Sequence, residues 1–561
     1  MRTFLFSCLL AFIIMVFSNC SSKLSEENFK KLVDDFSTKY SELEYKANLS
    51  EWNAMTSGDP EEYKKLEIAK NDITSFLKNK ELFDKVKEYR ENFKFSDMIL
   101  KRECDVLYRM LLPYQFDEEL SKEISKLEVK ITKEFSSYRA KVDDKVLSDN
   151  DVLEVLNKSS NSDYRKKVWL AQKNLGNIVA QDIKKVAKLR NRLAQKAGFK
   201  NFFDMKLTLG EFDKDSLDKI FNYLDENTKE SFSRLKDDID TFLAKKFKVD
   251  KSKLMPWHYN DLFFQRAPEI YKVDFDNFYK NQDIVKIAKT FYEKMNMDVD
   301  SILARSDLYE KKGKNQHAFS MCLDRKQDIR ILVNLKPNAE WMGTLLHELG
   351  HSVYDEYIDQ KLPFLLRTPS HAITTEATAM TFERNAINPY FINDNVEKIS
   401  SRDKLKELFK VSVNKMKAEK LIFTRWALVM YNFEKMFYEN PDQDCNSLWW
   451  SLVTKYQLLN KPDTLAGNEW ATKIHIATVP VYYHNYMVGE LMVSQVLDFI
   501  SKKYLNNKDI FSIVFYETPQ ISDFFKNKIF KPGNTVSWNE LIKQATGEYL
   551  NPQYFVNQYK Y

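Results

Sequence analysis

The chain has 561 residues, a net charge of +5, and only 11 Gly and 14 Pro. Its 86 basic residues are interspersed with 81 acidic ones and form no concentrated Lys or Arg block, so the charge pattern gives no support for nucleic-acid binding. No Ser-, Gly- or Pro-rich linker separates the long segments of Lys, Glu, Leu and Phe, which favours one large helical body over several domains.

The first twenty residues differ from the rest. A positive start at Met1-Arg2 precedes an almost wholly apolar run over residues 4–17, then a polar segment containing Cys20. This pattern predicts a signal peptide over residues 1–20, because the run is too short for a comfortable membrane span. With Cys20 lipidated, the protein would be an exported lipoprotein at the cell envelope, in the periplasm or on the cell surface; plain secretion is the alternative. Residues 21–561 are expected to form a single domain that touches a membrane only through this anchor.

Residues 24 to about 250 are typical of amphipathic helices, with apolar residues three and four positions apart. The predicted helices include residues 26–43, 60–77, 80–93, 117–135 and 165–197. This part contains no histidine, so its expected role is structural, as one wall of a cleft. A short aromatic helix or turn over residues 261–265 follows, and alone it indicates no function.

Two β-prone runs over residues 316–323 and 328–334 surround a four-residue polar turn and predict a β-hairpin. Its free edge could bind an extended peptide through main-chain hydrogen bonds. A hairpin that only covers the neighbouring helix fits the sequence equally well.

The motif His347-Glu348-Leu349-Gly350-His351 follows the hairpin. On a helix, residues four apart lie on one face, so both imidazoles can reach one metal ion, and zinc suits two His nitrogens and a carboxylate. Glu348 lies where it can take a proton from a metal-activated water. Asn338 is the expected N-cap of this helix. Gly343 and Gly350 share a face of it and suggest close approach by another helix.

A second helix, capped by Ser370, is expected to supply the third ligand. Glu376 and Glu383 are seven residues apart and share a face, so spacing alone permits either. His371 is a weaker candidate. Further on, residues 471–476 and 480–486 contain His and Tyr side chains that could stabilise an oxyanion.

Taken together, these residues resemble the angiotensin-converting enzyme family of zinc dipeptidyl carboxypeptidases, in its shorter bacterial single-domain form. The resemblance is clearest over residues 255–495, while the N-terminal half agrees only in being helical. It implies a mainly α fold of two halves that enclose a deep central channel, with a small β-hairpin beside the zinc helix. It also implies one zinc ion per chain and a monomer acting on short peptides with a free C-terminus.

The resemblance implies a role for each matching position. His317 and Ala318, thirty residues before His347, match the family's substrate-binding pair, and Glu376 rather than Glu383 matches its third zinc ligand. The other matches fall into two groups. The implied binders of the substrate's terminal carboxylate are Gln265, Lys473 and Tyr483. The implied catalytic residues, besides the base Glu348, are His475 near the scissile carbonyl and Tyr486 at the oxyanion.

Three departures limit the resemblance, the first of which is the absence of the cysteine pair that flanks the family's hairpin. Asn485 replaces an Arg that binds chloride in the family, so chloride activation is in doubt. Met380 replaces the acidic residue four positions after the third ligand, so the contacts that support the zinc histidines must differ.

The alternatives are a broader oligopeptidase or a single-residue carboxypeptidase on a related helical fold. A different class is a surface-binding lipoprotein whose catalysis is vestigial.

Overall fold

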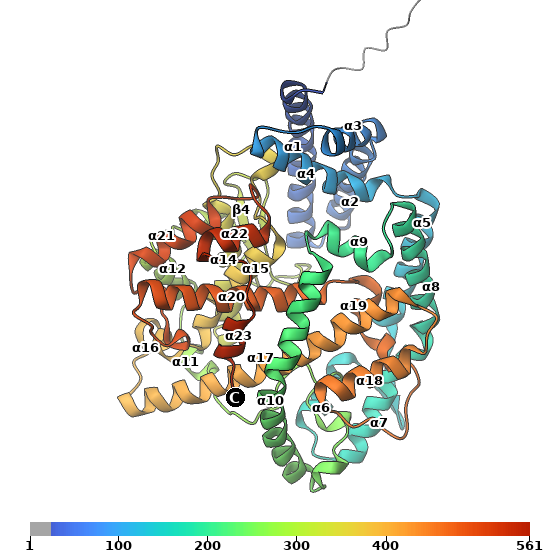
Figure 1. Ribbon diagram of the computed structural model, residues 1–561. Helices are drawn as coiled ribbons and strands as arrows, with labels where there is room; N and C mark the ends of the chain where they lie inside the picture. Colours follow the sequence, from blue (N-terminus) through green and yellow to red (C-terminus); the bar gives the residue numbers. More distant parts are fainter. Residues whose placement is uncertain (1–23) are drawn as a thin grey trace, which may run out of the picture.

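The computed structural model describes residues 24–561, so the predicted signal peptide and Cys20 lie outside the described residues. Helices make up most of this part, with two short antiparallel hairpins, which confirms the predicted mainly α fold (Figure 1). No helix in residues 24–561 is both long and apolar enough to cross a membrane.

The first part of the chain contains ten helices among the described residues: α1 (Glu26–Ser57), α2 (Pro60–Leu77), α3 (Lys80–Asn92), α4 (Met98–Leu111), α5 (Glu118–Ser137), α6 (Asp149–Lys158), α7 (Ser162–Lys173), α8 (Leu175–Lys196), α9 (Phe202–Leu209) and α10 (Lys214–Phe247). The middle part contains α11 (Asp276–Tyr279), α12 (Ile284–Lys294), α13 (Asp300–Arg305), α14 (Ala339–Glu356), α15 (Ala372–Glu383) and α16 (Pro389–Asn395). The last part contains α17 (Arg402–Glu439), α18 (Cys445–Gln457), α19 (Ile474–Thr478), α20 (Tyr483–Tyr504), α21 (Pro519–Phe524), α22 (Trp538–Thr546) and α23 (Gln553–Gln558). The hairpins are β1 (Ala140–Val142) with β2 (Lys145–Leu147), and β3 (Phe319–Cys322) with β4 (Ile329–Leu332).

The predicted helices are present with changed ends. The helix expected over residues 60–77 is confirmed as α2, whereas the one expected over 165–197 is divided at Asn174 into α7 and α8. The division places Gly176 against the backbone of Asn468, where a Cβ would lie 2.0 Å from the carbonyl oxygen. A close contact with a distant segment therefore sets this boundary, which helical periodicity cannot reveal.

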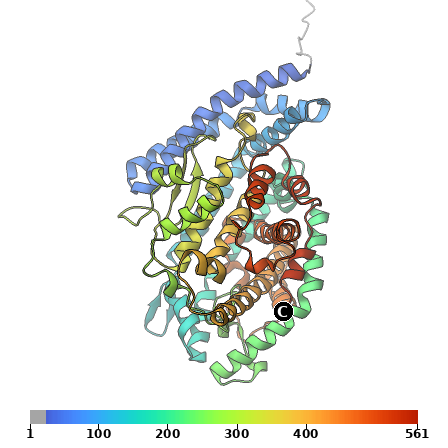
Figure 2. The same ribbon diagram turned by 90° about the vertical axis from the view of Figure 1, so that its left-hand side faces the viewer.

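Helices α1–α4 form a subdomain with its own small apolar core. Figures 1 and 2 show these blue helices gathered at one end of the molecule. Their core includes Phe29, Phe36, Val86 and Leu107, all buried, and is separate from the large core that runs through the rest of the described chain. The subdomain thus packs as a unit within the predicted single domain.

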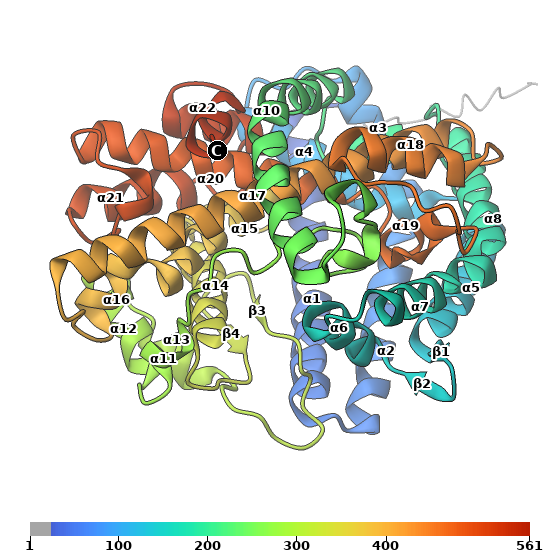
Figure 3. The same cartoon turned by 90° about the horizontal axis from the view of Figure 1, so that it is seen from below.

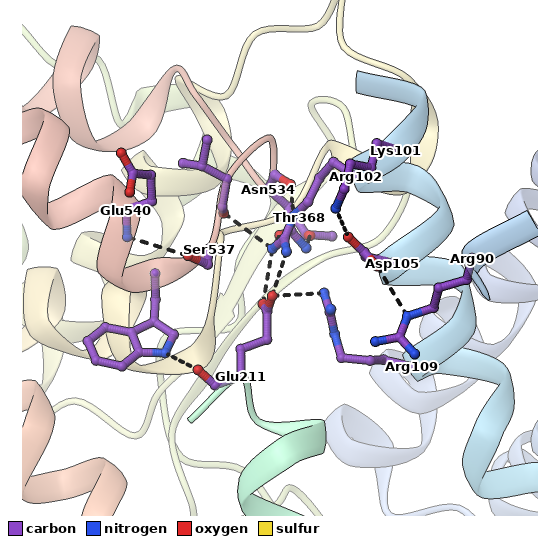
Figure 4. A network of polar contacts seen from close by, with 12 residues as sticks. Arg90, Lys101, Arg102, Asp105, Arg109, Glu211, Thr368, Asn534, Ser537 and Glu540 are labelled. Carbon is purple, nitrogen blue, oxygen red and sulfur yellow. Dashed lines mark hydrogen bonds and ion pairs between the residues drawn. The ribbon is translucent and has the colours of Figure 1, made fainter. Parts of the chain in front are cut away.

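A polar network joins this subdomain to two distant loops (Figure 4). Arg102 of α4 donates to both carboxylate oxygens of Glu211, at 2.5 and 3.0 Å, and through Nε to the Asn534 carbonyl at 2.9 Å. Arg109, two turns along α4, reaches the same carboxylate at 3.2 Å. Arg102 is about nine-tenths buried, so loss of either Arg102 or Glu211 would leave the other charge without its ion-pair partner. The network therefore fixes the orientation of the subdomain.

The remaining helices form two groups. In Figure 3, β3, β4 and α11–α16 lie on one side and α5–α8, α18 and α19 on the other, while the long helix α17 extends between them. Helix α17 packs on α16 and α20 as well as on α8 and α18, so it connects the groups.

Helices α14 and α15 pack closely through glycine. A Cβ on Gly350 would lie 2.9 Å from the Cα of Ala379 and 3.3 Å from the Phe382 ring. By contrast, a Cβ on Gly343 would meet side-chain atoms of Glu383 and Ala386 at 3.5 and 3.6 Å. The close approach expected from the two glycines is therefore confirmed, and it is tighter at Gly350.

Gly350→Ala is expected to destabilise the protein by about 1–3 kcal/mol, because the added methyl group overpacks against the backbone of α15. The matched control is Gly343→Ala, which has ordinary contact distances and is expected to be neutral or stabilising by about 0.5–1 kcal/mol. Urea unfolding of the three proteins measures both effects. Equal unfolding free energies for the two variants would contradict the prediction.

Candidate active site

Helices α14 and α15 place the metal-ligand candidates. Asn338 caps α14 by accepting a hydrogen bond from the Trp341 backbone N–H, as predicted. Helix α15 is capped by His371, whose Nδ1 accepts from the Ile373 N–H at 3.1 Å, so the prediction of Ser370 as the cap was wrong. Ser370 is instead buried, with its hydroxyl on Thr374.

His347, His351 and Glu376 form a cluster in which one ligand atom from each lies within 4.8 Å of the others. The two Nε2 atoms are 3.1 Å apart, and the Glu376 carboxylate oxygens lie 3.6 Å from His347 Nε2 and 3.9 Å from His351 Nε2. Two imidazole nitrogens and a carboxylate facing one point are the donors that zinc prefers, so the residues fit this metal. Spacing permitted Glu376 or Glu383, and the cluster contains Glu376.

The other nitrogen of each imidazole is held by α15. Glu383 Oε2 lies 2.9 Å from His347 Nδ1, and Thr375 Oγ1 lies 2.7 Å from His351 Nδ1. Although burial lowers the pKa of His347, its contact with Glu383 raises it above the ordinary value. Burial and the neighbouring His347 lower the pKa of His351 to about 3, so His351 is neutral and suited to ligation.

Glu348 lies buried beside the two histidines. Burial raises the pKa of its carboxyl group to about 7, opposed by the nearby His347 and by a backbone hydrogen bond from Ser320. A carboxylate with a pKa near neutrality can both accept and return a proton, as a general base requires.

The β3–β4 hairpin lies beside α14, as predicted. Ser320 Oγ and Ser352 Oγ are 2.9 Å apart and link strand β3 to α14. Within residues 24–561, β3 pairs only with β4, so its other edge is free. Just before β3, Ala318 is half-buried and His317 is exposed.

Gln265, Lys473 and Tyr483 converge although more than 200 residues separate the first from the others. Lys473 Nζ donates to Gln265 Oε1 at 3.0 Å, and the Tyr483 hydroxyl lies 3.5 Å from the same oxygen. Asp261 holds the Gln265 turn by accepting backbone hydrogen bonds from Phe263, Gln265 and Arg266. We call Gln265, Lys473 and Tyr483 the polar clamp.

Lys473 is a buried ammonium within aromatic walls. The rings of Phe263, Trp426 and Tyr483 have centroids 5.1, 5.4 and 5.4 Å from its Nζ. Burial lowers the pKa of Lys473 to about 8. Among the described residues its one hydrogen-bond partner is the Gln265 amide and it forms no ion pair. The clamp therefore holds a cation whose counter-charge can come from a bound anion.

His475 and Tyr486 lie next to the clamp. The ring centroids of His475 and Tyr486 lie 5.0 and 5.4 Å, respectively, from that of Tyr483. Burial lowers the pKa of His475 to about 4, so its ring is neutral, and its buried Nδ1 has no hydrogen-bond partner in the described part of the chain. Burial and the nearby Glu376 carboxylate raise the pKa of Tyr486. Tyr486 is thus a neighbour both of Tyr483 in the clamp and of Glu376 in the metal-ligand cluster.

Two cavities border this row of residues. One, of about 700 Å³, is lined partly by Asp261 and Gln265, and the other, of about 610 Å³, by Glu383 and the first turns of α14. The two cavities share four lining residues, Val273, Asp274, Lys415 and Glu419, and therefore adjoin. The adjoining cavities therefore lie beside α17, one at Gln265 and the other at Glu383.

Sequence reasoning missed several neighbours of the site. Glu383 was considered only as a ligand, although its seven-residue spacing from Glu376 placed it on the correct face. Nothing in the sequence distinguished Thr375, or Phe263 and Trp426, because their roles depend on contacts across the fold.

Comparisons with known proteins identify two peptidase families. The model of peptidase family M3 matches residues 155–561, which include all of the site residues above. The angiotensin-converting enzyme model matches residues 23–258. Together the two matches support an angiotensin-converting-enzyme-like protein. The second match lies in the N-terminal half, which was expected to resemble that family only in being helical. That expectation was wrong. No curated protein matches the chain.

Proposed function

The chain belongs to peptidase family M3 and is a zinc metallopeptidase, and from this premise we propose that it releases dipeptides from the free C-terminus of short peptides. We further propose that it is exported, carries a lipid on Cys20, and acts as a monomer.

The polar clamp carries this proposal. A buried ammonium with an amide and a phenol around it, which forms no ion pair within residues 24–561, suits a peptide's terminal carboxylate. The clamp lies next to His475 and Tyr486, and Tyr486 is close enough to Glu376 for its pKa to respond to that carboxylate. Holding the C-terminus at a fixed distance from the metal cluster would select which peptide bond is cut.

His347, His351 and Glu376 would hold the zinc ion, which when bound supplies a Lewis acid that activates water and polarises the scissile carbonyl. Glu348 then accepts the proton of the attacking water and passes it to the leaving amine. Tyr486 and the neutral His475 donate hydrogen bonds to the developing oxyanion. His317, Ala318 and the free edge of β3 hold the substrate backbone in an extended conformation.

A broader oligopeptidase is the second candidate, because the M3 model rather than the angiotensin-converting enzyme model covers the metal-ligand cluster and the clamp. Such an enzyme, or a single-residue carboxypeptidase, would use the same metal and base. Only the spacing of its cuts would differ.

Product masses from a set of peptides distinguish these candidates. Peptides of five to ten residues are digested in free-acid and C-terminally amidated forms, and the products are weighed over time. We expect successive losses of two residues from the free acids and slow cleavage of the amides. Single-residue losses, or internal cuts that occur equally in both forms, would contradict dipeptide release.

The clamp predicts a pH dependence. Below about pH 8, Lys473 is protonated and can bind the substrate carboxylate; above it, the group becomes neutral because burial has lowered its pKa. For free-acid peptides kcat/KM, which reports groups of the free enzyme, should therefore fall about tenfold per pH unit above pH 8. Amidated peptides serve as the control, because their cleavage does not use the ammonium. An identical alkaline profile for both forms would exclude Lys473 as the cause.

A further inference from the structure

Glu383 occupies a position from which it can support a zinc ligand without being one. It ends α15, two turns after Glu376 on the same face. Its Oε2 contacts His347 Nδ1 at 2.9 Å, while His347 Nε2 faces His351 and Glu376. One imidazole therefore has its metal-facing nitrogen in the cluster and its opposite nitrogen on Glu383.

Two features of the packing allow Glu383 to contact His347. At Met380, four positions after Glu376, the side chain lies against α20, where its Cε would be 2.9 Å from a Cβ on Gly489. At Gly343, one turn before His347, an added Cβ would lie 3.5 and 3.9 Å from the Cγ and Oε1 of Glu383, which is ordinary contact, so a side chain larger than a methyl group would meet Glu383. The carboxylate can therefore lie across α14 and contact the histidine.

The basic side chains next to Glu383 are held by another carboxylate, which leaves Glu383 paired with His347. The neighbouring Glu490 is already paired with Arg384 and Lys420. At His351, by contrast, the corresponding nitrogen Nδ1 lies 2.7 Å from the neutral hydroxyl of Thr375.

We infer that Glu383 is a positioning residue that orients His347 toward the metal and strengthens it as a ligand, taking the place of the acidic residue that Met380 replaces. The inference about Glu383 rests on the proposed function, because it requires that His347, His351 and Glu376 bind zinc. Carboxylates that hold a ligating histidine contribute about 10- to 100-fold to metal affinity.

Zinc affinity of the purified protein tests the inference. The zinc dissociation constant is measured by competition with a chromophoric chelator for wild type, Glu383→Ala, Glu383→Gln, Glu376→Ala and the control Glu340→Ala, which changes an exposed carboxylate on α14. Glu383→Ala should weaken zinc binding about 10- to 100-fold, and Glu376→Ala more than that. Glu383→Gln, which keeps an acceptor oxygen but loses the charge, should fall between wild type and Glu383→Ala. Glu340→Ala should match wild type.

Two further readouts separate positioning from folding. The metal-free variants should melt at the wild-type temperature, and cobalt-substituted Glu383→Gln should show a shifted absorption spectrum. If Glu383→Ala does not fold, Gly343→Leu offers a second route, because its bulk should displace Glu383 and weaken zinc binding while every ligand remains.

Wild-type zinc affinity in Glu383→Ala would overturn the inference. A loss of zinc affinity equal to that of Glu376→Ala would also overturn it, because Glu383 would then be a ligand. A wild-type protein that binds no zinc would instead overturn the proposed function.

Discussion

Replacing Glu348 by Gln is expected to lower kcat for peptide hydrolysis by about 100- to 10,000-fold, the usual contribution of a general acid-base group. The amide keeps the volume and buried position of the side chain but cannot accept a proton from water. Because Glu348 is not among the three residues of the metal-ligand cluster, zinc content should not change. Steady-state kinetics on a free-acid peptide and metal analysis of the same sample measure the two effects.

The control is Glu340→Gln, which makes the same chemical change at an exposed position of the same helix. It should retain wild-type kcat, KM and zinc content. If Glu348→Gln hydrolyses every tested peptide at the wild-type rate, the protein is a binding lipoprotein with vestigial catalysis, or another residue is the base. Zinc loss in Glu348→Gln would leave its low kcat uninformative about proton transfer, and Glu348→Asp would then separate the two roles.

The sequence was most informative where function depends on local geometry. A helix brings residues four apart onto one face, so the pairing of His347 and His351 followed from the motif, and the cap at Asn338 followed from local hydrogen bonding. The β3–β4 hairpin was likewise evident from two apolar runs around a polar turn. Each of these features is determined within a stretch of about twenty residues.

Features that depend on distant contacts could not be predicted in the same way. Residues 261–265 alone indicated no function, and the contact between Gln265 and Lys473 comes from the fold. The break between α7 and α8 results from an approach by Asn468, almost 300 residues away. The small β1–β2 hairpin was missed for another reason, because strands of three residues are too short to show alternation.

The resemblance supplied what periodicity could not, with unequal success. It named Glu376 as the third ligand when spacing left Glu383 open, and the geometry now places the two in different positions around His347. It also noted that Met380 removes an acidic partner. It could not show that Glu383, one turn further along, contacts His347, because that contact depends on how α14 and α15 pack.

Lys473→Met is expected to lower kcat/KM for free-acid peptides by roughly 30-fold to several thousand-fold, which corresponds to the loss of about 2–5 kcal/mol when one partner of a buried charge pair is removed. Methionine fills much of the same space among Phe263, Trp426 and Tyr483, so packing should be preserved while the charge is lost. Cleavage of amidated peptides should change little, and the preference for a free carboxylate should largely disappear.

Lys173→Met is the matched control for this substitution. Lys173 is also buried, and its Nζ lies 3.6 Å from the Phe263 ring centroid, but it donates to Thr472 rather than to Gln265. Its removal takes away a buried cation next to the clamp without touching the proposed carboxylate position, so the preference for free acids over amides should survive. If both variants lose that preference equally, a diffuse positive potential selects the C-terminus. If only Lys473→Met does, the selection comes from one ammonium placed at a fixed distance from the metal.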